Sequence, residues 1–175
     1  MKKYHPLLVA LHWILVPMLM LALVMGGNVL VEIPNDSAEK IGALKGHMIM
    51  GLIIGSLMVL RLITRLFTKK PPHADIGNAF VNKIGVLAHY VLYLLVLIMA
   101  ASGMATSLQA GLPDIIFGGS GAALPETFAI YAPRIAHGII AKALFAMIIL
   151  HVLGALYHQF ITKDGLFSRM WFGKR

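Results

Sequence analysis

Apolar residues form four long stretches along the chain, and shorter segments between them carry most of the charged, glycine and proline residues. The stretches cover residues 5–25, 43–67, 83–107 and 133–162. Each is long enough to cross about 30 Å of hydrocarbon, which takes roughly 20 helical residues. A segment inside lipid must satisfy its own backbone hydrogen bonds, so stretches of this length predict helices. We therefore predict an all-α, integral membrane four-helix bundle, with residues 1–175 forming a single domain.

The ends of these stretches carry helix-breaking signals. The second stretch ends before Pro71-Pro72, and the fourth begins at Pro133, a residue type favoured in the first turn of a helix. A loop rich in glycine and proline separates the third stretch from the fourth. The first stretch follows only Met-Lys-Lys-Tyr and lacks a small-residue cleavage site, which favours a retained helix over a signal peptide.

The composition narrows the possible chemistry. The chain is 59% hydrophobic and 13% charged, so lipid is expected to cover much of its surface. The sequence has no cysteine, which excludes disulfides, iron–sulfur clusters, thiolate zinc sites and covalently attached c-type haem. The net charge of +8 would suit a nucleic-acid partner, but the basic residues lie mainly between the apolar stretches. That distribution is typical of membrane orientation, and no nucleic-acid partner is predicted.

The distribution of lysine and arginine predicts the orientation of the bundle. Three basic residues, Lys40, Lys45 and Arg134, lie on the side of the two loops that precede the second and fourth stretches. Because the cytoplasmic side carries the excess of basic residues, both termini are predicted to be cytoplasmic. The other side, with both termini and the link between the second and third stretches, carries eleven basic residues. They are Lys2, Lys3, Arg61, Arg65, Lys69, Lys70, Lys83, Lys163, Arg169, Lys174 and Arg175.

Histidines are the main ionisable residues inside the apolar stretches. An ionisable side chain in a membrane helix is costly and is a candidate for function. One such histidine is explained equally well by a hydrogen bond to a neighbouring helix, whereas six at matched depths favour cofactor ligands. The six are His12, His47, His89, His137, His151 and His158.

The spacing of these histidines predicts two levels in the membrane. His137 and His151 are fourteen residues apart, which corresponds to about 21 Å along a helix and returns to nearly the same face. His47 is expected at the depth of His137, near the outer surface. His12 and His89 are expected at the depth of His151, near the cytoplasmic surface.

Paired imidazoles at each level predict two b-type haems. Two axial histidines leave no open position on the iron, which favours electron transfer over oxygen binding. We assign the outer haem to His47 and His137. For the inner haem, His151 is expected to pair with either His12 or His89, and spacing alone leaves both open.

Residues near these histidines suggest further contacts. Arg61 and Arg65 lie fourteen and eighteen residues after His47, where they either bind the inner haem propionates or extend to the cytoplasmic surface. Gly51 and Gly55 follow His47 by four and eight residues. Their small size suits either a flat macrocycle near the backbone or close helix packing.

Four other residues have predicted positions or roles. Gly103 lies fourteen residues after His89 and is placed to leave space beside the outer haem. Lys142 lies well inside the fourth stretch and is either a charged relay or a side chain that extends to the membrane surface. His5 and His73 are predicted to be surface residues.

An ordered set of short motifs resembles the bacterial cytochrome b561 family over essentially the whole chain. The motifs are Leu11-His12-Trp13, His47, Leu87-Ala88-His89-Tyr90, His137…His151-(x6)-His158, Lys163-Asp164 and Arg169-Met170. The resemblance implies a four-helix, di-haem b cytochrome of the bacterial inner membrane. It favours His12 over His89 as the partner of His151. It also implies ubiquinone as the cytoplasmic-side partner and superoxide oxidation as a candidate activity. His158 and His89 are expected toward the same side and are candidate quinone contacts.

Three functions therefore compete. The leading one is an oxidoreductase or simple electron carrier that passes single electrons between a small periplasmic donor, such as superoxide, and ubiquinone. The second is a cytochrome b subunit that anchors a periplasmic dehydrogenase or hydrogenase and needs a partner subunit. The third is a histidine-lined metal-ion transporter, which the scarcity of acidic residues in the apolar stretches disfavours. Lys40, Lys45 and Arg134 are predicted to attract an anionic donor to the outer haem.

Overall fold

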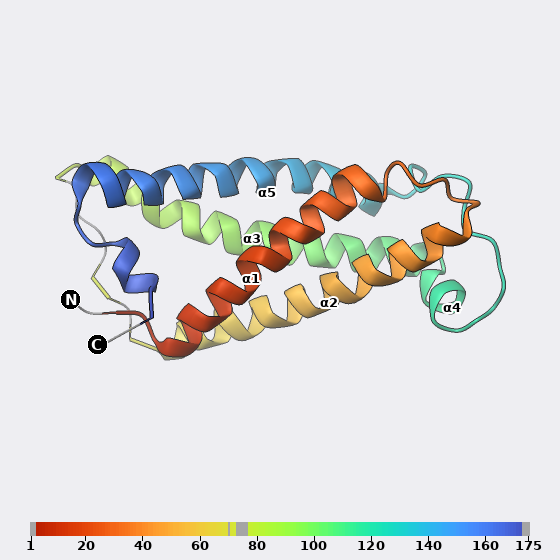
Figure 1. Ribbon diagram of the computed structural model, residues 1–175, viewed down its shortest axis with the longest axis horizontal. Coiled ribbons are helices and arrows are strands. Elements are labelled where there is room, and N and C mark those ends of the chain that lie inside the picture. Colours follow the sequence, from red (N-terminus) through yellow and green to blue (C-terminus); the bar gives the residue numbers. More distant parts are fainter. Residues whose placement is uncertain (1–2, 70, 73–76, 173–175) are drawn as a thin grey trace.

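The computed structural model describes residues 3–69, 71–72 and 77–172, and within these ranges the regular elements are helices, without strands. Four of the helices are long and apolar enough to cross a membrane. This confirms the predicted all-α fold with four membrane spans. The α-helices are α1 (Pro6–Val24), α2 (Ala38–Phe67), α3 (Ala79–Gln109), the short α4 (Leu112–Ile116) and α5 (Ala132–Tyr157) (Figure 1).

Capping residues make the second and third spans longer than the apolar pattern predicts. α2 begins at Ala38 rather than near residue 43, because the Ser37 side chain accepts a hydrogen bond from the Lys40 backbone N–H. α3 begins at Ala79 rather than near residue 83, where the Asn78 side chain accepts bonds from the first turn. The start of each helix depends on a single capping side chain, which the hydrophobic pattern does not register.

The loop before the fourth span contains α4, which the glycine and proline content did not predict. Gly111 has a φ of 64°, a left-handed conformation that suits glycine and turns the chain sharply after α3. Leu112 and Ile116 of α4 are buried together with Ala110. The short helix thus closes one end of the bundle.

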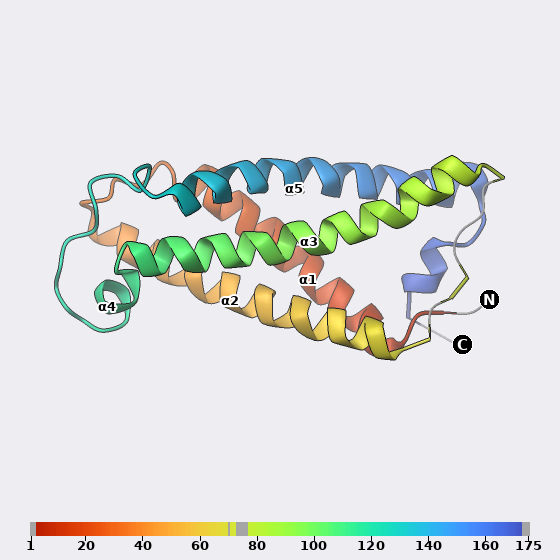
Figure 2. The ribbon, with the colours of Figure 1, turned by 180° about the vertical axis from the view of Figure 1, so that it is seen from behind.

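The four long helices run lengthwise, with α1 neighbouring α2, α2 neighbouring α3, and α3 neighbouring α5. α1 crosses the front of the bundle diagonally (Figure 1), and α3 lies in front when the molecule is seen from behind (Figure 2). Both chain ends and the link between α2 and α3 lie together at what we call the termini end. The opposite end, with α4 and the loop between α1 and α2, is called the α4 end.

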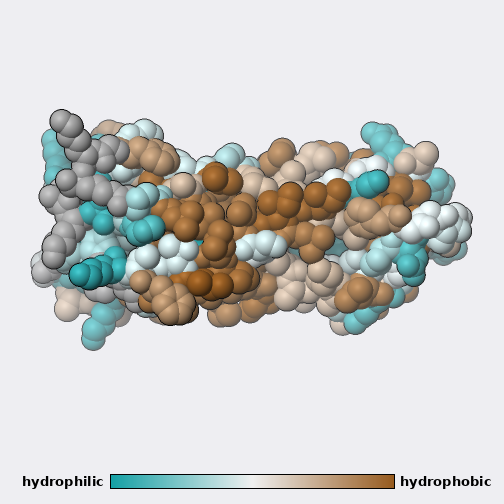
Figure 3. Space-filling model, turned by 90° about the horizontal axis from the view of Figure 1, so that it is seen from below, coloured by the Kyte–Doolittle hydropathy of each residue, from teal (hydrophilic) through white to brown (hydrophobic). Residues whose placement is uncertain are grey.

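A small apolar core lies in the middle of the bundle, and apolar side chains also cover much of its outside. Figure 3 shows an apolar band between two more hydrophilic ends, as expected for a protein surrounded by lipid. Lys142 is exposed on α5, on the surface of the bundle rather than in its interior. The buried core residues are Leu15, Ile54, Met58, Val96 and Leu144.

The termini lie at one end of the bundle, as an even number of spans requires. The assignment of that end to the cytoplasm remains a prediction from the basic residues. His73 and four of the eleven basic residues used for it lie outside the described residues. These four are Lys2, Lys70, Lys174 and Arg175.

Candidate functional site

One pair of histidines lies toward the α4 end of the bundle. The ring centroids of His47 on α2 and His137 on α5 are 6.2 Å apart, and the ring planes cross at 78°. Both side chains are partly buried. The two helices therefore bring together the pair that their predicted depths suggested.

Polar groups of α3 hold the His137 ring. Its Nδ1 lies 3.1 Å from the Met99 carbonyl oxygen and 3.1 Å from the Ser102 hydroxyl. A proton on Nδ1 can be donated to the Met99 carbonyl, which leaves Nε2 as the lone-pair nitrogen. A Cβ on Gly103 would lie 3.1 Å from His137 Cε1, so this glycine lets α3 approach the ring closely.

The His47 ring has a different environment. Its Nδ1 is buried and has no hydrogen-bond partner among the described residues. The ring lies against Gly26, in the π-helical turn Met25–Val29 that follows α1, where a Cβ would meet His47 Cε1 at 3.0 Å. A buried polar nitrogen without a partner is costly, so this ring is one that a bound polar group would stabilise.

Three histidines meet toward the termini end. The ring centroids of His12 and His151 are 6.3 Å apart with an interplanar angle of 76°. His89 lies closer to His151, at 5.2 Å between centroids. Its Nδ1 is 2.7 Å from the Gly85 carbonyl oxygen of its own helix, and the side chain is exposed. His12 and His89 thus have different relations to His151, although sequence spacing did not distinguish them.

Arg61 lies beside this group of histidines. Its guanidinium acts electrostatically on both His12 and His151. It donates a hydrogen bond to the Leu8 carbonyl of α1 and lies over the Tyr93 ring, 5.7 Å from its centroid. Arg61 therefore lies near His12 and His151, at the level where the sequence predicts it. Its side chain also connects α1, α2 and α3.

The remaining small and basic residues on α2 have separate roles. The Arg65 guanidinium stacks over Tyr4, 5.6 Å from its ring centroid, nearer the end of the bundle. Gly55 packs against Ala100 of α3, where a Cβ would lie 3.2 Å from the alanine Cβ. A Cβ on Gly51 would meet nothing within 4 Å, so space is open beside the helix one turn after His47.

The three basic residues at the α4 end are not equally available to an anion. Lys40 is buried, and its Nζ donates to the carbonyls of Leu30 and Ile33, at 2.5 and 2.8 Å. This lysine fastens the loop between α1 and α2, so the expectation that it attracts a donor is not supported. Lys45 is exposed over the Phe117 ring, and Arg134 acts electrostatically on both His47 and His137.

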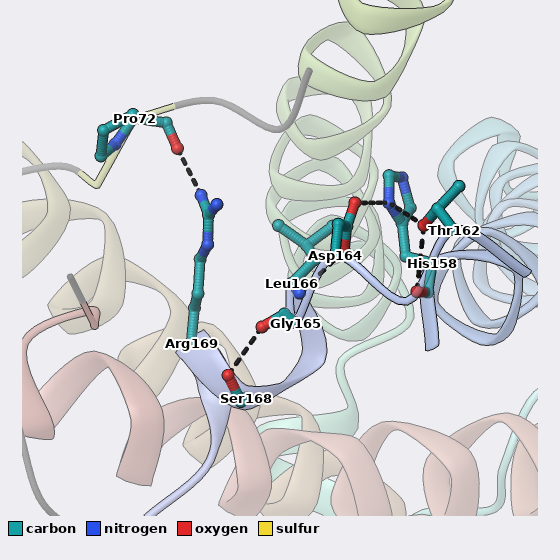
Figure 4. Close-up of polar contacts among 8 residues, drawn as sticks. All are labelled: Pro72, His158, Thr162, Asp164, Gly165, Leu166, Ser168 and Arg169. Carbon is teal, nitrogen blue, oxygen red and sulfur yellow. Dashed lines mark hydrogen bonds and ion pairs between the residues drawn. The ribbon is translucent and has the colours of Figure 1, made fainter. Parts of the chain in front are cut away.

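The C-terminal segment, residues 163–172, packs against Trp13, next to His12. The Trp13 indole N–H donates to the Met170 carbonyl at 2.7 Å, and the Trp13 ring contacts both Trp171 and His12 edge to face. Arg169 donates to the Pro72 carbonyl at 2.5 Å (Figure 4). The residues after α5 are therefore fixed to the start of α1 and to the link between α2 and α3.

Sequence reasoning missed several of these contacts. Ser102 and Met99 face His137, but a serine or a backbone carbonyl within an apolar stretch carries no sequence signal of its own. Gly26 lies next to His47 although the two are 21 positions apart. Only the crossing of α1 over α2 brings them together.

Comparison with known proteins identifies the family. Residues 3–173 match the family described as prokaryotic cytochrome b561. The chain belongs to this family. It is also 25% identical over 181 residues to a Yersinia pestis protein described as "Probable superoxide oxidase CybB", in an alignment that covers 99% of this chain and 98% of that protein.

Membership of the family establishes the coarse function. Cytochromes b561 bind haem b and transfer electrons, and the four apolar spans make this chain a multi-pass membrane protein. The histidine pairs at the two ends of the bundle are its candidate haem-binding residues. An oxidoreductase role agrees with the description of the Yersinia pestis relative.

Proposed function

We propose that this chain carries two haem b groups and passes single electrons from a small donor at the α4 end to ubiquinone at the termini end. The residues that would hold the haems are His47 with His137 and His12 with His151. The observation that carries the proposal is the pair of 6.2 and 6.3 Å ring separations, which recur on opposite sides of the apolar core.

These separations suit two imidazoles on one metal. A metal–imidazole bond of about 2.0 Å and a ring radius of about 1.1 Å on each side place two centroids roughly 6.2 Å apart. The 5.2 Å between His89 and His151 is too short for that arrangement. This supports His12, rather than His89, as the partner of His151.

Other features fit a haem at each level. Gly26 and Gly103 allow the His47 and His137 rings to lie close to neighbouring backbone, and Gly51 leaves open space nearby. Arg61 is placed to pair with a propionate at the termini end. A haem bound between two histidines supplies a one-electron carrier that has no free coordination position.

The donor and acceptor are proposed from the same geometry and from the relative. Lys45 and Arg134 remain as basic groups near the α4-end pair and would attract an anion such as superoxide. His89, His158 and the C-terminal part of α5 lie toward the termini end, where a membrane-dissolved quinone can approach. With the termini in the cytoplasm, the protein would sit in the bacterial inner membrane and oxidise a periplasmic donor.

Purified protein tests this function directly. We expect about two non-covalent haems per chain by pyridine haemochrome analysis, reduction of both by a superoxide pulse, and reoxidation on addition of ubiquinone. Absence of b-type haem would contradict the ligand assignment. Haems that superoxide leaves oxidised, but that a periplasmic dehydrogenase reduces, would favour the anchoring-subunit function instead.

A further inference from the structure

A histidine–aspartate pair lies just beyond the last membrane span. His158 Nδ1 is 2.5 Å from Asp164 Oδ2, and both side chains are partly buried, with 18% and 25% of their surfaces exposed. It is the one ion pair found among the described residues that involves an acidic side chain. Figure 4 shows the His158 ring between Asp164 and Thr162.

The backbone is shaped to bring the two residues together. α5 ends in the π-helical turn His158–Thr162, and the next residue, Lys163, has a φ of 51°. A left-handed conformation at a non-glycine residue is unfavourable, and it reverses the chain here so that Asp164 returns toward His158. Both π-helical turns and such strained residues are frequent at functional sites.

The Asp164 carboxyl is held in its charged form. Burial raises its pKa, but hydrogen bonds from the Leu166 N–H and from His158 outweigh this and bring the pKa below its ordinary value. Leu166 N–H donates to Oδ1 at 2.9 Å, so the other oxygen remains for His158. The carboxylate therefore fixes the ring with Nδ1 as the donor.

The outer nitrogen of His158 is left available. No described residue hydrogen-bonds to Nε2, and Thr162 contacts only the Nδ1 side of the ring, at 3.4 Å. The end of the helix does not need this imidazole, because Thr162 Oγ1 donates to the His158 backbone carbonyl instead. A role in capping therefore leaves the histidine–aspartate pair unexplained.

His158 lies further along the α5 face that carries the proposed haem ligands His137 and His151. His158 follows His151 by seven residues, or two helical turns, which places it on nearly the same face and about 10.5 Å further toward the termini end. The α5 face that carries both proposed haem levels thus continues to an imidazole oriented by a carboxylate. Such an imidazole is a common general acid in enzymes.

We propose that His158 and Asp164 form a proton-transfer pair for quinone reduction, with His158 Nε2 as the donor to a quinone oxygen and Asp164 as its positioning residue. The inference rests on the proposed function. Conversion of one quinone to quinol takes two electrons, from two one-electron donors, and two protons. In each transfer the ring starts with protons on both nitrogens, Nδ1–H bonded to Asp164 and Nε2–H facing the quinone. The Nε2–H bond breaks, an O–H bond forms on the quinone, and the neutral ring, with its remaining proton on Nδ1, takes a new Nε2 proton from water at the termini end.

A comparison of two acceptors tests this role. Chemically reduced full-length protein is mixed with ubiquinone-1, whose reduction requires protons, or with ferricyanide, whose reduction does not. His158→Gln is expected to slow reoxidation by ubiquinone-1 by about 100-fold, mainly in kcat rather than KM, and to leave the ferricyanide rate unchanged. Asp164→Asn should have a smaller effect in the same direction, with recovery in Asp164→Glu.

Controls separate this role from a structural one. Asp36→Asn makes the same chemical change at an exposed residue of the α4 end and should leave both rates unchanged. Equal slowing with both acceptors, or no slowing with ubiquinone-1, would overturn the proton-transfer role. Wild-type protein that ubiquinone-1 does not reoxidise would instead overturn the proposed quinone acceptor, and this inference with it.

Discussion

The two ends of the bundle hold their histidines in different ways. At the α4 end, His47 and His137 form a single pair. A glycine lies against each ring, and the Met99 carbonyl and Ser102 hydroxyl lie at hydrogen-bond distance from His137. At the termini end, His12 and His151 share their space with His89, an arginine and an aromatic cluster of the C-terminal segment. The first arrangement suits a fixed electron carrier with few accessory groups. The second brings charged and proton-exchanging groups close to the carrier, as a quinone site requires.

The largest effect is expected from removal of one ligand at each end. His137→Ala should reduce the haem content from about two to about one per chain, and His151→Ala should do the same with the other haem. The 21 Å rise between the two residues makes the losses independent. Low-temperature absorption spectra distinguish the haems, and loss of the same spectral component in both variants would contradict the two-level arrangement.

The third histidine of the termini end provides a sharper test. His12→Ala should lose the haem of that end, whereas His89→Ala should retain it, because only the His12–His151 separation suits a shared iron. Haem stoichiometry and electron paramagnetic resonance of the low-spin iron measure the difference. A haem lost in His89→Ala and kept in His12→Ala would reverse the assignment.

Close approach of the backbone is the next feature to test. Gly103→Val should displace the His137 ring, since even a Cβ at this position lies 3.1 Å from it. We expect partial loss of the α4-end haem and an altered potential, with the other haem unchanged. Gly27→Val is the matched control, because a Cβ there meets nothing within 4 Å. Redox titration of both variants shows whether the α4 end alone responds.

The smallest effect concerns the acid stability of the termini end. The pKa of Asp164 is lower in the folded chain than its ordinary value, so the carboxylate stabilises the fold above about pH 4 and loses this effect as the pH falls through the folded pKa. Wild type should exceed Asp164→Asn in Tm by about 1–3 °C at neutral pH, and the difference should vanish in acid. Thermal unfolding in detergent, followed by circular dichroism, measures it. A difference that persisted at pH 2 would mean that the hydrogen bonds act without the charge.

The apolar pattern was sufficient for the fold class because lipid imposes a simple requirement on length and hydrogen bonding. Four spans, their approximate positions and the return of the chain to its starting side all follow from it. The first turns of α2 and α3 and the short α4 do not, because they depend on single capping residues and on a left-handed glycine.

For the histidines, too, the sequence determines some relations and the tertiary structure determines others. Helical rise and periodicity are local properties, so the sequence by itself determined that His137 and His151 lie at different depths and that His47 matches the first. It could not distinguish His12 from His89, because both have the same depth. Only the tertiary structure decided how far each ring lies from His151, that Gly26 touches the α4-end pair, and that Asp164 turns back onto His158. These relations depend on helix crossing and on one reversed turn, and neither leaves a periodic signal in the sequence.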